Sequence, residues 1–159
     1  MNDQEFSPWT LREASAADIE QLVAFNCAIA KETENKQLDR AVVARGVSRG
    51  LERGPEVVYY VAEDDRSLLG MLMLTREWSD WRDGWLVWIQ SVFVTPEARG
   101  RGVFRSLLRH VLSVLRESPD VLGVRLYVER DNTRAQAVYH RCGFDDPRYQ
   151  VLEQLFNDR

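Results

Sequence analysis

Residues 89–108, IQSVFVTPEARGRGVFRSLL, carry the pattern that decides the fold. The apolar, β-branched run up to Val94 predicts a buried strand, which Thr95-Pro96 ends. Arg99 to Gly102 reads RGRG, a tight glycine loop. Apolar residues then recur at helical spacing, at Phe104, Leu107, Leu108, Val111, Leu112 and Leu115.

This order directs backbone N–H groups and the positive end of a helix dipole at one place, where small residues let an anion approach. The stretch predicts a phosphate-binding site, to which Arg99 and Arg101 add charge. A tight connection with solvated arginines is the alternative. Neither a P-loop nor a dinucleotide fingerprint fits, because no Gly-Lys-Ser/Thr opens the helix and Phe104 breaks the glycine pattern.

Another strand and a helix are expected downstream. Residues 121–128 read as a strand, and Asn132 is a good N-cap for a helix that runs to Cys142 and stops at Gly143. Asn132 and Tyr139 are seven residues apart, so two helical turns place them on nearly the same face.

These segments together resemble the GCN5-related N-acetyltransferase (GNAT) family. The resemblance extends over about residues 8–159, and its specific motifs lie in residues 89–144. The family's loop pattern, Arg/Gln-x-x-Gly-x-Gly/Ala, is matched by Arg99 and Gly102, whereas Phe104 replaces the final small residue. The matching residues are Val94-Thr95-Pro96-Glu97-Ala98-Arg99-Gly100-Arg101-Gly102, Leu126-Tyr127-Val128, Asn132, Ala135, Tyr139 and Gly143-Phe144.

The resemblance implies acetyl-CoA as acyl donor, with its carbonyl and pantetheine amides paired to the backbone of residues 92–94. Tyr139 is then the proton donor to the CoA sulfur. On spacing alone, residues 92–94 are ordinary ladder residues, Tyr139 is a core residue and Asn132 only caps a helix. The expected cofactor-binding residues are Val92, Phe93, Val94, Arg99, Gly100, Arg101, Gly102, Val103, Phe104, Arg105, Asn132 and Tyr139.

The general base is less clearly marked. Many family members carry a glutamate in the strand before the loop, but here Gln90 stands there, and an amide accepts no proton usefully near neutral pH. Glu77 or Asp80 is expected to deprotonate the amine, directly or through water, with Glu34 as the alternative.

The segment 77–83, EWSDWRD, is expected to connect two strands. Its tryptophans and carboxylates predict either an exposed hairpin or an acidic, aromatic wall that binds a cationic amine. The expected substrate-binding residues are Glu34, Glu77, Trp78, Asp80, Trp81 and Gln90.

The order of elements predicts a mixed α/β (α+β) fold: a central, mostly antiparallel twisted sheet with about four helices. Residues 1–7 are expected to form a flexible tail, and residues 8–159 a single N-acetyltransferase domain. Ser15 and Asp39 are expected to cap the first two helices. The expected strands cover residues 9–13, 57–62, 68–75, 85–94, 121–128 and 149–155.

Composition indicates a globular protein. The 159 residues are 45% hydrophobic, with a net charge of −4 and no basic block, which argues against a disordered chain and against nucleic acid as main partner. Without a signal peptide or a long apolar run, a cytoplasmic protein with no membrane partner is expected. Cys27 and Cys142 are expected to be reduced thiols, and His110 and His140 to be surface residues. No metal is expected, and the sequence leaves open whether the protein forms a homodimer.

The expected function is direct transfer of an acetyl group from acetyl-CoA to a primary amine of a small molecule, through a ternary complex. A non-catalytic acyl-CoA-binding or sensing domain is one alternative, which Gln90 favours and Tyr139 opposes. An acetyltransferase acting on protein N-termini or lysines is the other. That activity needs an open peptide groove, which Trp78 and Trp81 do not suggest.

Overall fold

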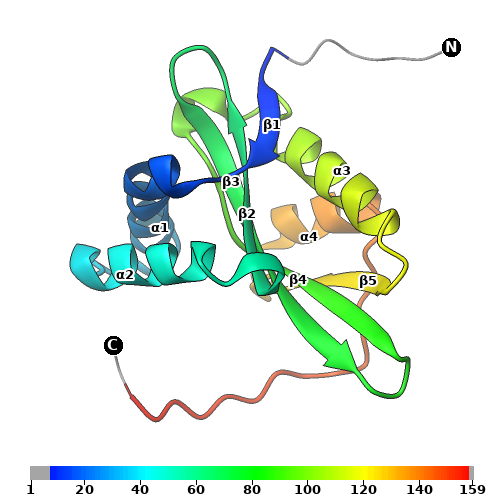
Figure 1. The fold of residues 1–159 in the computed structure, drawn as a ribbon. Helices are drawn as coiled ribbons and strands as arrows, with labels where there is room; N and C mark the ends of the chain where they lie inside the picture. Colours follow the sequence, from blue (N-terminus) through cyan, green and yellow to red (C-terminus); the bar gives the residue numbers. More distant parts are fainter. Residues whose placement is uncertain (1–7, 158–159) are drawn as a thin grey trace, which may run out of the picture. The chain divides into compact units, whose positions relative to one another are not determined.

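The computed structural model describes residues 8–157, so the tail expected at residues 1–7 lies outside the described residues. The chain forms two compact units, residues 1–126 and residues 127–159. Figure 1 shows the elements of both.

The first unit contains a five-stranded sheet and three α-helices. The sheet order is β1-β2-β3-β4-β5, with antiparallel pairs except for the parallel β4–β5 pair. This confirms the predicted mixed, mostly antiparallel sheet. The elements are β1 (Thr10–Glu13), α1 (Ile19–Glu34), α2 (Arg40–Leu51), β2 (Val57–Glu63), β3 (Leu68–Ser79), β4 (Gly84–Val94), α3 (Val103–Arg116) and β5 (Val121–Leu126).

The first two helices begin where the sequence predicts. Ser15 and Asp18 form a capping box at the short 3-10 turn that leads into α1. The Asp39 carboxylate accepts from the backbone N–H of Ala41 at 2.8 Å and so caps α2.

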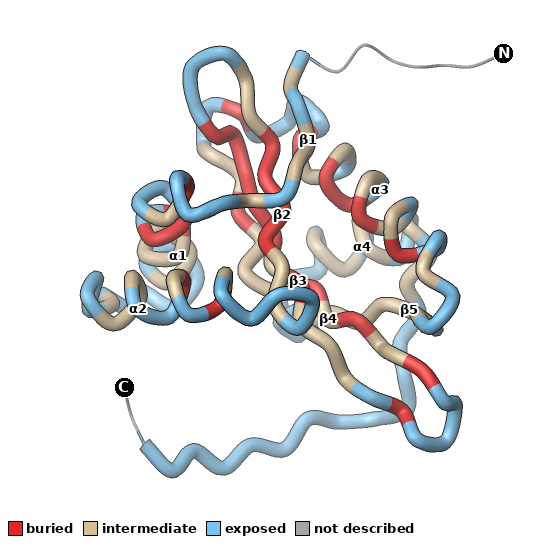
Figure 2. The backbone as a smooth tube through the Cα atoms, in the orientation of Figure 1, coloured by how far each residue is buried: buried red, intermediate tan, exposed pale blue. Residues whose placement is uncertain are grey.

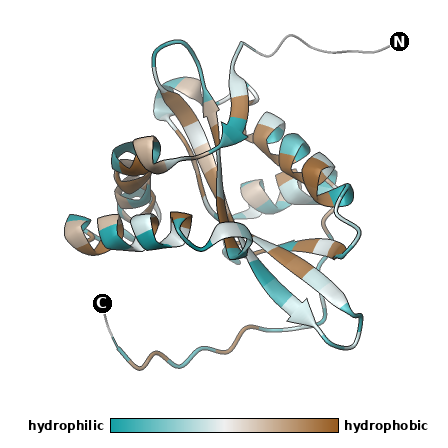
Figure 3. Cartoon of the chain, viewed as in Figure 1, coloured by the Kyte–Doolittle hydropathy of each residue, from teal (hydrophilic) through white to brown (hydrophobic). Residues whose placement is uncertain are grey.

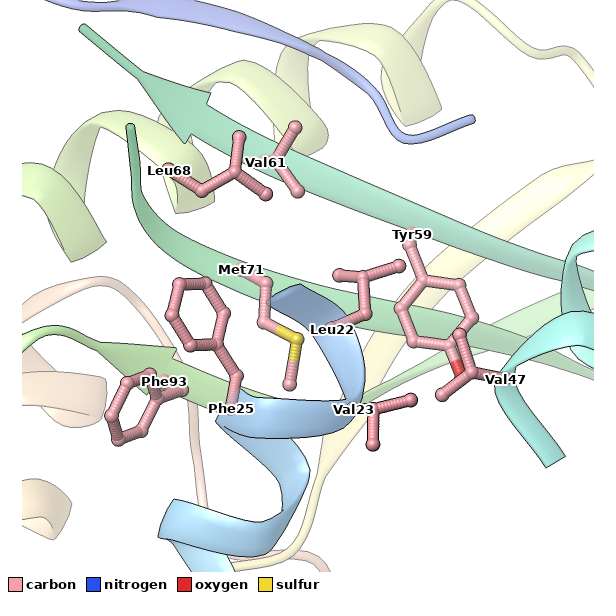
Figure 4. Packing of buried hydrophobic residues seen from close by; sticks show 9 residues of the cluster. All are labelled: Leu22, Val23, Phe25, Val47, Tyr59, Val61, Leu68, Met71 and Phe93. Carbon is pink, nitrogen blue, oxygen red and sulfur yellow. The ribbon is translucent and has the colours of Figure 1, made fainter. Parts of the chain in front are cut away.

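Helices α1 and α2 lie on one face of the sheet, and α3 lies on the other (Figure 1). The core on the first face joins α1, α2 and three strands. Figure 4 shows the Phe25 and Phe93 rings within it, which lie next to each other at a tilt of 36°, with centroids 4.9 Å apart. Its buried members are Leu22, Val23, Phe25, Val47, Tyr59, Val61, Leu68, Met71 and Phe93.

Helix α3 buries one apolar stripe and leaves polar residues outside, an alternation that Figure 3 shows along the helix. Leu107, Leu108 and Val111 are almost completely buried, and Figure 2 shows buried segments in the central strands as well. His110 was predicted to be a surface residue, and this was wrong. Its ring is half-buried and meets Tyr60 edge-on, with centroids 5.6 Å apart.

The second unit is built around α4 (Thr133–Arg141). The Asn132 side chain accepts from the Ala135 N–H at 3.0 Å, which confirms the predicted N-cap. Gly143 has a φ of +89°, and the Phe144 N–H returns to the carbonyl of Tyr139 at 3.1 Å.

Three of the predicted strands differ from the structure by two residues or more. Strand β3 continues to Ser79, because cross-strand pairing with β4 goes on as far as Ser79↔Gly84. Strand β5 ends at Leu126 rather than Val128. Residues 149–155 form no strand, because strand-like residue types also need a ladder partner, which local sequence does not supply.

Candidate active site

A β-bulge interrupts β4 shortly before its end. Met71 pairs with Phe93, but Met73 pairs with Gln90, so β4 contains one residue more than β3 between these pairs. Ser91 takes a φ of +50°, which non-glycine residues rarely adopt. The bulge brings Gln90 and Phe93, three residues apart, to the same face of the sheet.

Beyond the bulge, one edge of β4 is open. The last pair between β4 and β5 is Ile89↔Leu126, so within the described strands residues 90–94 pair only with β3. The Thr95 N–H donates to the Leu69 carbonyl at 2.9 Å. Because that peptide is trans, the Val94 carbonyl points the other way, toward the open edge.

The glycine loop follows this edge and leads into α3. Gly100 and Gly102 have φ values of +75° and +92°, and a Cβ on either would meet no atom within 4 Å. Glycine is therefore required there by the backbone, and the space in front of it is open. Gly102 is the N-cap of α3, and among residues 8–157 no side chain caps this helix. The result is an uncapped helix N-terminus behind an open glycine loop, which suits an anion.

The two loop arginines are engaged with other side chains. Arg99 forms a two-oxygen ion pair with Glu32 of α1 at 2.7 and 3.0 Å, and its Nε donates to the Val94 carbonyl at 3.0 Å. The Arg101 guanidinium lies 5.7 Å from the centre of the Trp9 ring. Arg99 therefore connects the loop to α1 and to β4. The sequence had predicted no role for Glu32, its partner in α1.

Polar side chains occupy the face of the sheet that carries α1 and α2. Gln90 donates through Nε2 to the Thr75 hydroxyl at 2.6 Å. The Trp88 indole N–H donates to Glu77 Oε2 at 2.7 Å, and Arg125 Nη1 contacts the same carboxylate at 3.0 Å. These residues come from β3, β4 and β5, and all are half-buried.

The segment 77–83 does not form one continuous wall. Glu77 and Trp78 follow each other in a strand, so their side chains point to opposite faces. Trp78 packs against Trp85, with ring centroids 4.9 Å apart, away from Glu77. Asp80 and Trp81 lie in the hairpin turn, where Trp81 is 86% exposed. The connection, for which the sequence left an exposed hairpin and an acidic, aromatic wall as alternatives, is thus divided between two faces of the sheet and a turn.

Three carboxylates were predicted as candidate general bases. Two of them lie far from the bulge along the sheet, and the third lies on a different side of α1 from Glu32. Glu77 is paired with Leu86, four residues along β4 from Gln90, or about 13 Å at the usual strand rise. Asp80 lies further out in the turn. Glu34 follows Glu32 by two residues, which rotates it about 200° around α1 from the side that meets Arg99.

In the second unit, Tyr139 lies on the face of α4 that meets the residue after Gly143. Its ring packs edge-on against Phe144, with centroids 5.9 Å apart. Burial, with a smaller contribution from Cys142, raises the pKa of the Tyr139 phenol. An ordinary tyrosine phenol is already protonated at neutral pH, and the raised pKa keeps it so, as a proton donor must be.

Two further findings concern residues 8–157. No three histidine, cysteine or acidic side chains among them are grouped so as to hold a metal ion. None of the helices in this range is long and apolar enough to cross a membrane.

A model of the acetyltransferase (GNAT) family matches residues 19–144. The chain belongs to the GNAT family. This confirms the resemblance found in the strand, glycine loop and helix of residues 89–108. The family assignment rests on 126 consecutive residues, which include β4, the loop, α3 and α4.

Two named acetyltransferases match part of this GNAT chain. It is 39% identical over 87 residues to mycothiol acetyltransferase of Mycolicibacterium gilvum, over 52% of this chain and 27% of that protein. It is 33% identical over 104 residues to streptothricin acetyltransferase of Escherichia coli, over 62% of this chain and 56% of that protein. The chain thus spans about a quarter and somewhat more than half of these two relatives.

Solved structures resemble the fold over most of the chain. A possible acetyltransferase from Clostridium difficile 630 superposes with a TM-score of 0.88 at 34% identity, over 96% of this chain and 100% of that one. A predicted acetyltransferase with acetyl-CoA from Clostridium acetobutylicum has a TM-score of 0.75, over 92% of this chain and 96% of that one. At 17% identity, that second likeness concerns the fold alone.

Several residues of the site were not found from the sequence of this GNAT protein. Trp88, Thr75 and Arg125 meet across three strands, and their contacts depend on the register. Arg125 did have a local signal, since it is the one charged residue within the apolar strand at 121–126. The left-handed conformation of Ser91 had none.

Proposed function

We propose that this protein is an acetyl-CoA-dependent N-acetyltransferase that transfers the acetyl group directly to a primary amine of a small molecule, in a ternary complex. The observation that carries the proposal is the open edge of β4 at the bulge, followed at once by the glycine loop and the uncapped end of α3.

The residues present fit acetyl-CoA as donor. Backbone groups of Val92, Phe93 and Val94 on and beside the open edge are proposed to pair with the pantetheine amides and to polarise the thioester carbonyl. The backbone of the loop and first helical turn is proposed to bind the pyrophosphate. The proposed cofactor-binding set remains Val92, Phe93, Val94, Arg99, Gly100, Arg101, Gly102, Val103, Phe104, Arg105, Asn132 and Tyr139.

Arg99 has a defined part in this proposal. Its Nε bond to the Val94 carbonyl and its ion pair with Glu32 hold the loop against the end of β4. We assign it to positioning the loop rather than to carrying an unpaired charge for the phosphates. Arg105, which is exposed in the first turn of α3, is the better placed of the two to add charge there.

Proton movements are assigned as follows. Acetyl-CoA supplies an acetyl group activated as a thioester. Tyr139, whose phenol is protonated at neutral pH as in any ordinary tyrosine and whose pKa burial raises further, is proposed to give a proton to the departing sulfur. The amine proton is proposed to leave through water, because Gln90 cannot take it and Glu77 is already held by Trp88 and Arg125.

Thiol release from acetyl-CoA, measured with a panel of amines and with product masses, tests this function. We expect acetylated small primary amines. Acetyl-CoA binding without transfer to any acceptor would instead favour an acyl-CoA-binding domain, which the Gln90–Thr75 hydrogen bond makes the second candidate. Transfer only to peptides would favour a protein acetyltransferase.

A further inference from the structure

The side chain of Arg125 lies close to the point where strands β4 and β5 cease to pair. Arg125 is paired with Trp88, and the next pair, Ile89↔Leu126, is the last between the two strands. Arg125 is two residues along the sheet from the level of Gln90, or about 7 Å. One small molecule can therefore reach both Arg125 and the bulge.

The face on which Arg125 lies is the open one at this point. The opposite face of the same strands is filled, since Leu74, Val87 and Ile89 are 5%, 1% and 3% exposed. Trp88 and Gln90 point to the other side and are only half-buried. If acetyl transfer occurs at the bulge, the acceptor approaches over Trp88, Gln90 and Arg125.

The Arg125 guanidinium is fixed in place by two neighbours. Its Nη1 contacts both oxygens of Glu77, at 3.0 and 3.3 Å, and its centre lies 5.8 Å from the middle of the Trp88 ring. The Trp88 indole N–H donates to the same carboxylate at 2.7 Å. Glu77 thereby orients the ring and the cation together.

The contact with Glu77 leaves the Nε and Nη2 side of the Arg125 guanidinium unused. A guanidinium typically binds a carboxylate through two parallel N–H donors. Here Glu77 uses a single nitrogen, and within residues 8–157 no hydrogen bond or ion pair engages Nε or Nη2. The Arg125 side chain is 28% exposed, so solvent or a ligand can reach it.

The same contacts argue against a site for a second cation. The Glu77 Oε2 atom already accepts two hydrogen bonds, one from the Trp88 indole and one from Arg125. The positive charge of Arg125 also balances the negative charge of this carboxylate. An additional ammonium group would meet Arg125 beside it. A negatively charged oxygen group would meet a positioned donor pair instead.

We propose that Arg125, oriented by Glu77 and Trp88, binds a carboxylate or phosphate group of the amine acceptor. The acceptor class is thus an amine that also carries an anionic oxygen group, several bonds from its nitrogen. This inference rests on the proposed acetyl transfer and adds the substrate class. Glu77 becomes a positioning residue, and Arg125 the residue that determines specificity.

Matched acceptors test the proposal. We would measure kcat/KM for γ-aminobutyrate against n-butylamine, and for O-phosphoethanolamine against ethanolamine. The wild type is expected to prefer at least one anionic partner by about 10- to 100-fold, the usual effect of hydrogen bonds to charged groups. Which pair shows the preference distinguishes a carboxylate from a phosphate.

Variants locate the preference. Arg125→Gln should reduce the ratio to near one, mainly through a higher KM for the anionic acceptor, while the affinity for acetyl-CoA, whose proposed site does not include Arg125, stays within about twofold. Arg76→Gln is the matched control, because Arg76 lies over Trp85 on the opposite face, at 5.8 Å, and should leave the ratio unchanged. Arg125→Lys keeps the charge and covers the case that the glutamine variant does not fold; it should reduce the ratio in part.

Equal rates with anionic and neutral acceptors in the wild type would overturn the inference and leave the proposed function standing. So would a preference that survives both Arg125 variants. If no amine is acetylated although acetyl-CoA binds, the proposed function fails, and this inference fails with it.

Discussion

The variant Gly102→Val tests two roles of Gly102. Its effect on stability reports the need for glycine at a positive φ, and its effect on acetyl-CoA affinity reports whether the loop binds an anion. Gly102 has a φ of +92°, and a Cβ there would meet no atom within 4 Å. The cost to stability is therefore that of a left-handed L residue, about 1–2 kcal/mol. For a chain of this length, that corresponds to a loss of about 2–8 °C in Tm.

The effect on the donor is expected to be larger than strain alone explains. A valine side chain at the N-cap of α3 would hold the pyrophosphate away from the backbone of the loop and first turn. Losing one charge-assisted hydrogen bond costs about 1.5–3 kcal/mol, or about 10- to 150-fold in Kd. Isothermal titration calorimetry with acetyl-CoA measures the affinity, and thermal unfolding measures the stability.

Gly54→Val is the matched control. Gly54 has a φ of +59° and equally open surroundings, but it precedes β2 and is not part of the loop. Both variants should lose similar stability, and only Gly102→Val should lose affinity. Equal acetyl-CoA affinities in the two variants would show that the loop does not bind the pyrophosphate.

Three further predictions concern other parts of the molecule. Tyr139→Phe should lower turnover by about 10²- to 10⁴-fold with unchanged acetyl-CoA affinity, and wild-type turnover in the variant would assign the acid elsewhere. Since burial raises the phenol pKa, the wild-type rate should not fall through loss of this proton until the pH exceeds the range in which an ordinary tyrosine ionises. The hydrogen bond from Arg12 lowers the pKa of Asp18, so this carboxylate stabilises the fold near neutrality and the contribution is lost on acidification. Urea midpoints between about pH 6 and pH 3 should therefore fall more steeply in the wild type than in Asp18→Asn, and parallel curves would contradict this. Gly70→Ala should cost about 1–3 kcal/mol, because its Cβ would come 2.7 Å from a backbone oxygen of β4. Gly123→Ala, whose Cβ would meet only a side-chain atom at 3.5 Å, should cost less, and equal losses would argue against the clash.

The local sequence was sufficient for the parts of the fold that depend on neighbouring residues. The side chains of the N-cap residues Ser15, Asp39 and Asn132 accept from N–H groups within three residues, so the positions of these caps follow from the local sequence. The glycine loop after β4 is local in the same sense, because a positive φ at Gly100 and Gly102 depends on residue type.

The strand bounds and the face on which each strand side chain lies depend on which strands pair and in which register, so only the tertiary structure decided them. Residues 149–155 have the composition of a strand but pair with no strand in the described part of the chain. Strand β3 in contrast reaches Ser79, because Trp78 and Trp85 continue its pairing. Alternation along β3 puts Glu77 and Trp78 on opposite faces, so neighbours in sequence do not share a site.

The polar cluster that determines the proposed specificity has the same origin. Glu77, Trp88 and Arg125 are separated by up to 48 residues and meet only because β3, β4 and β5 lie side by side in one register. The sequence by itself determined the family, the caps and the glycine loop, all of which are written in short-range patterns. The bulge at Ser91, the open edge of β4 and the orientation of Arg125 required the sheet, because hydrogen bonds between distant strands place these groups.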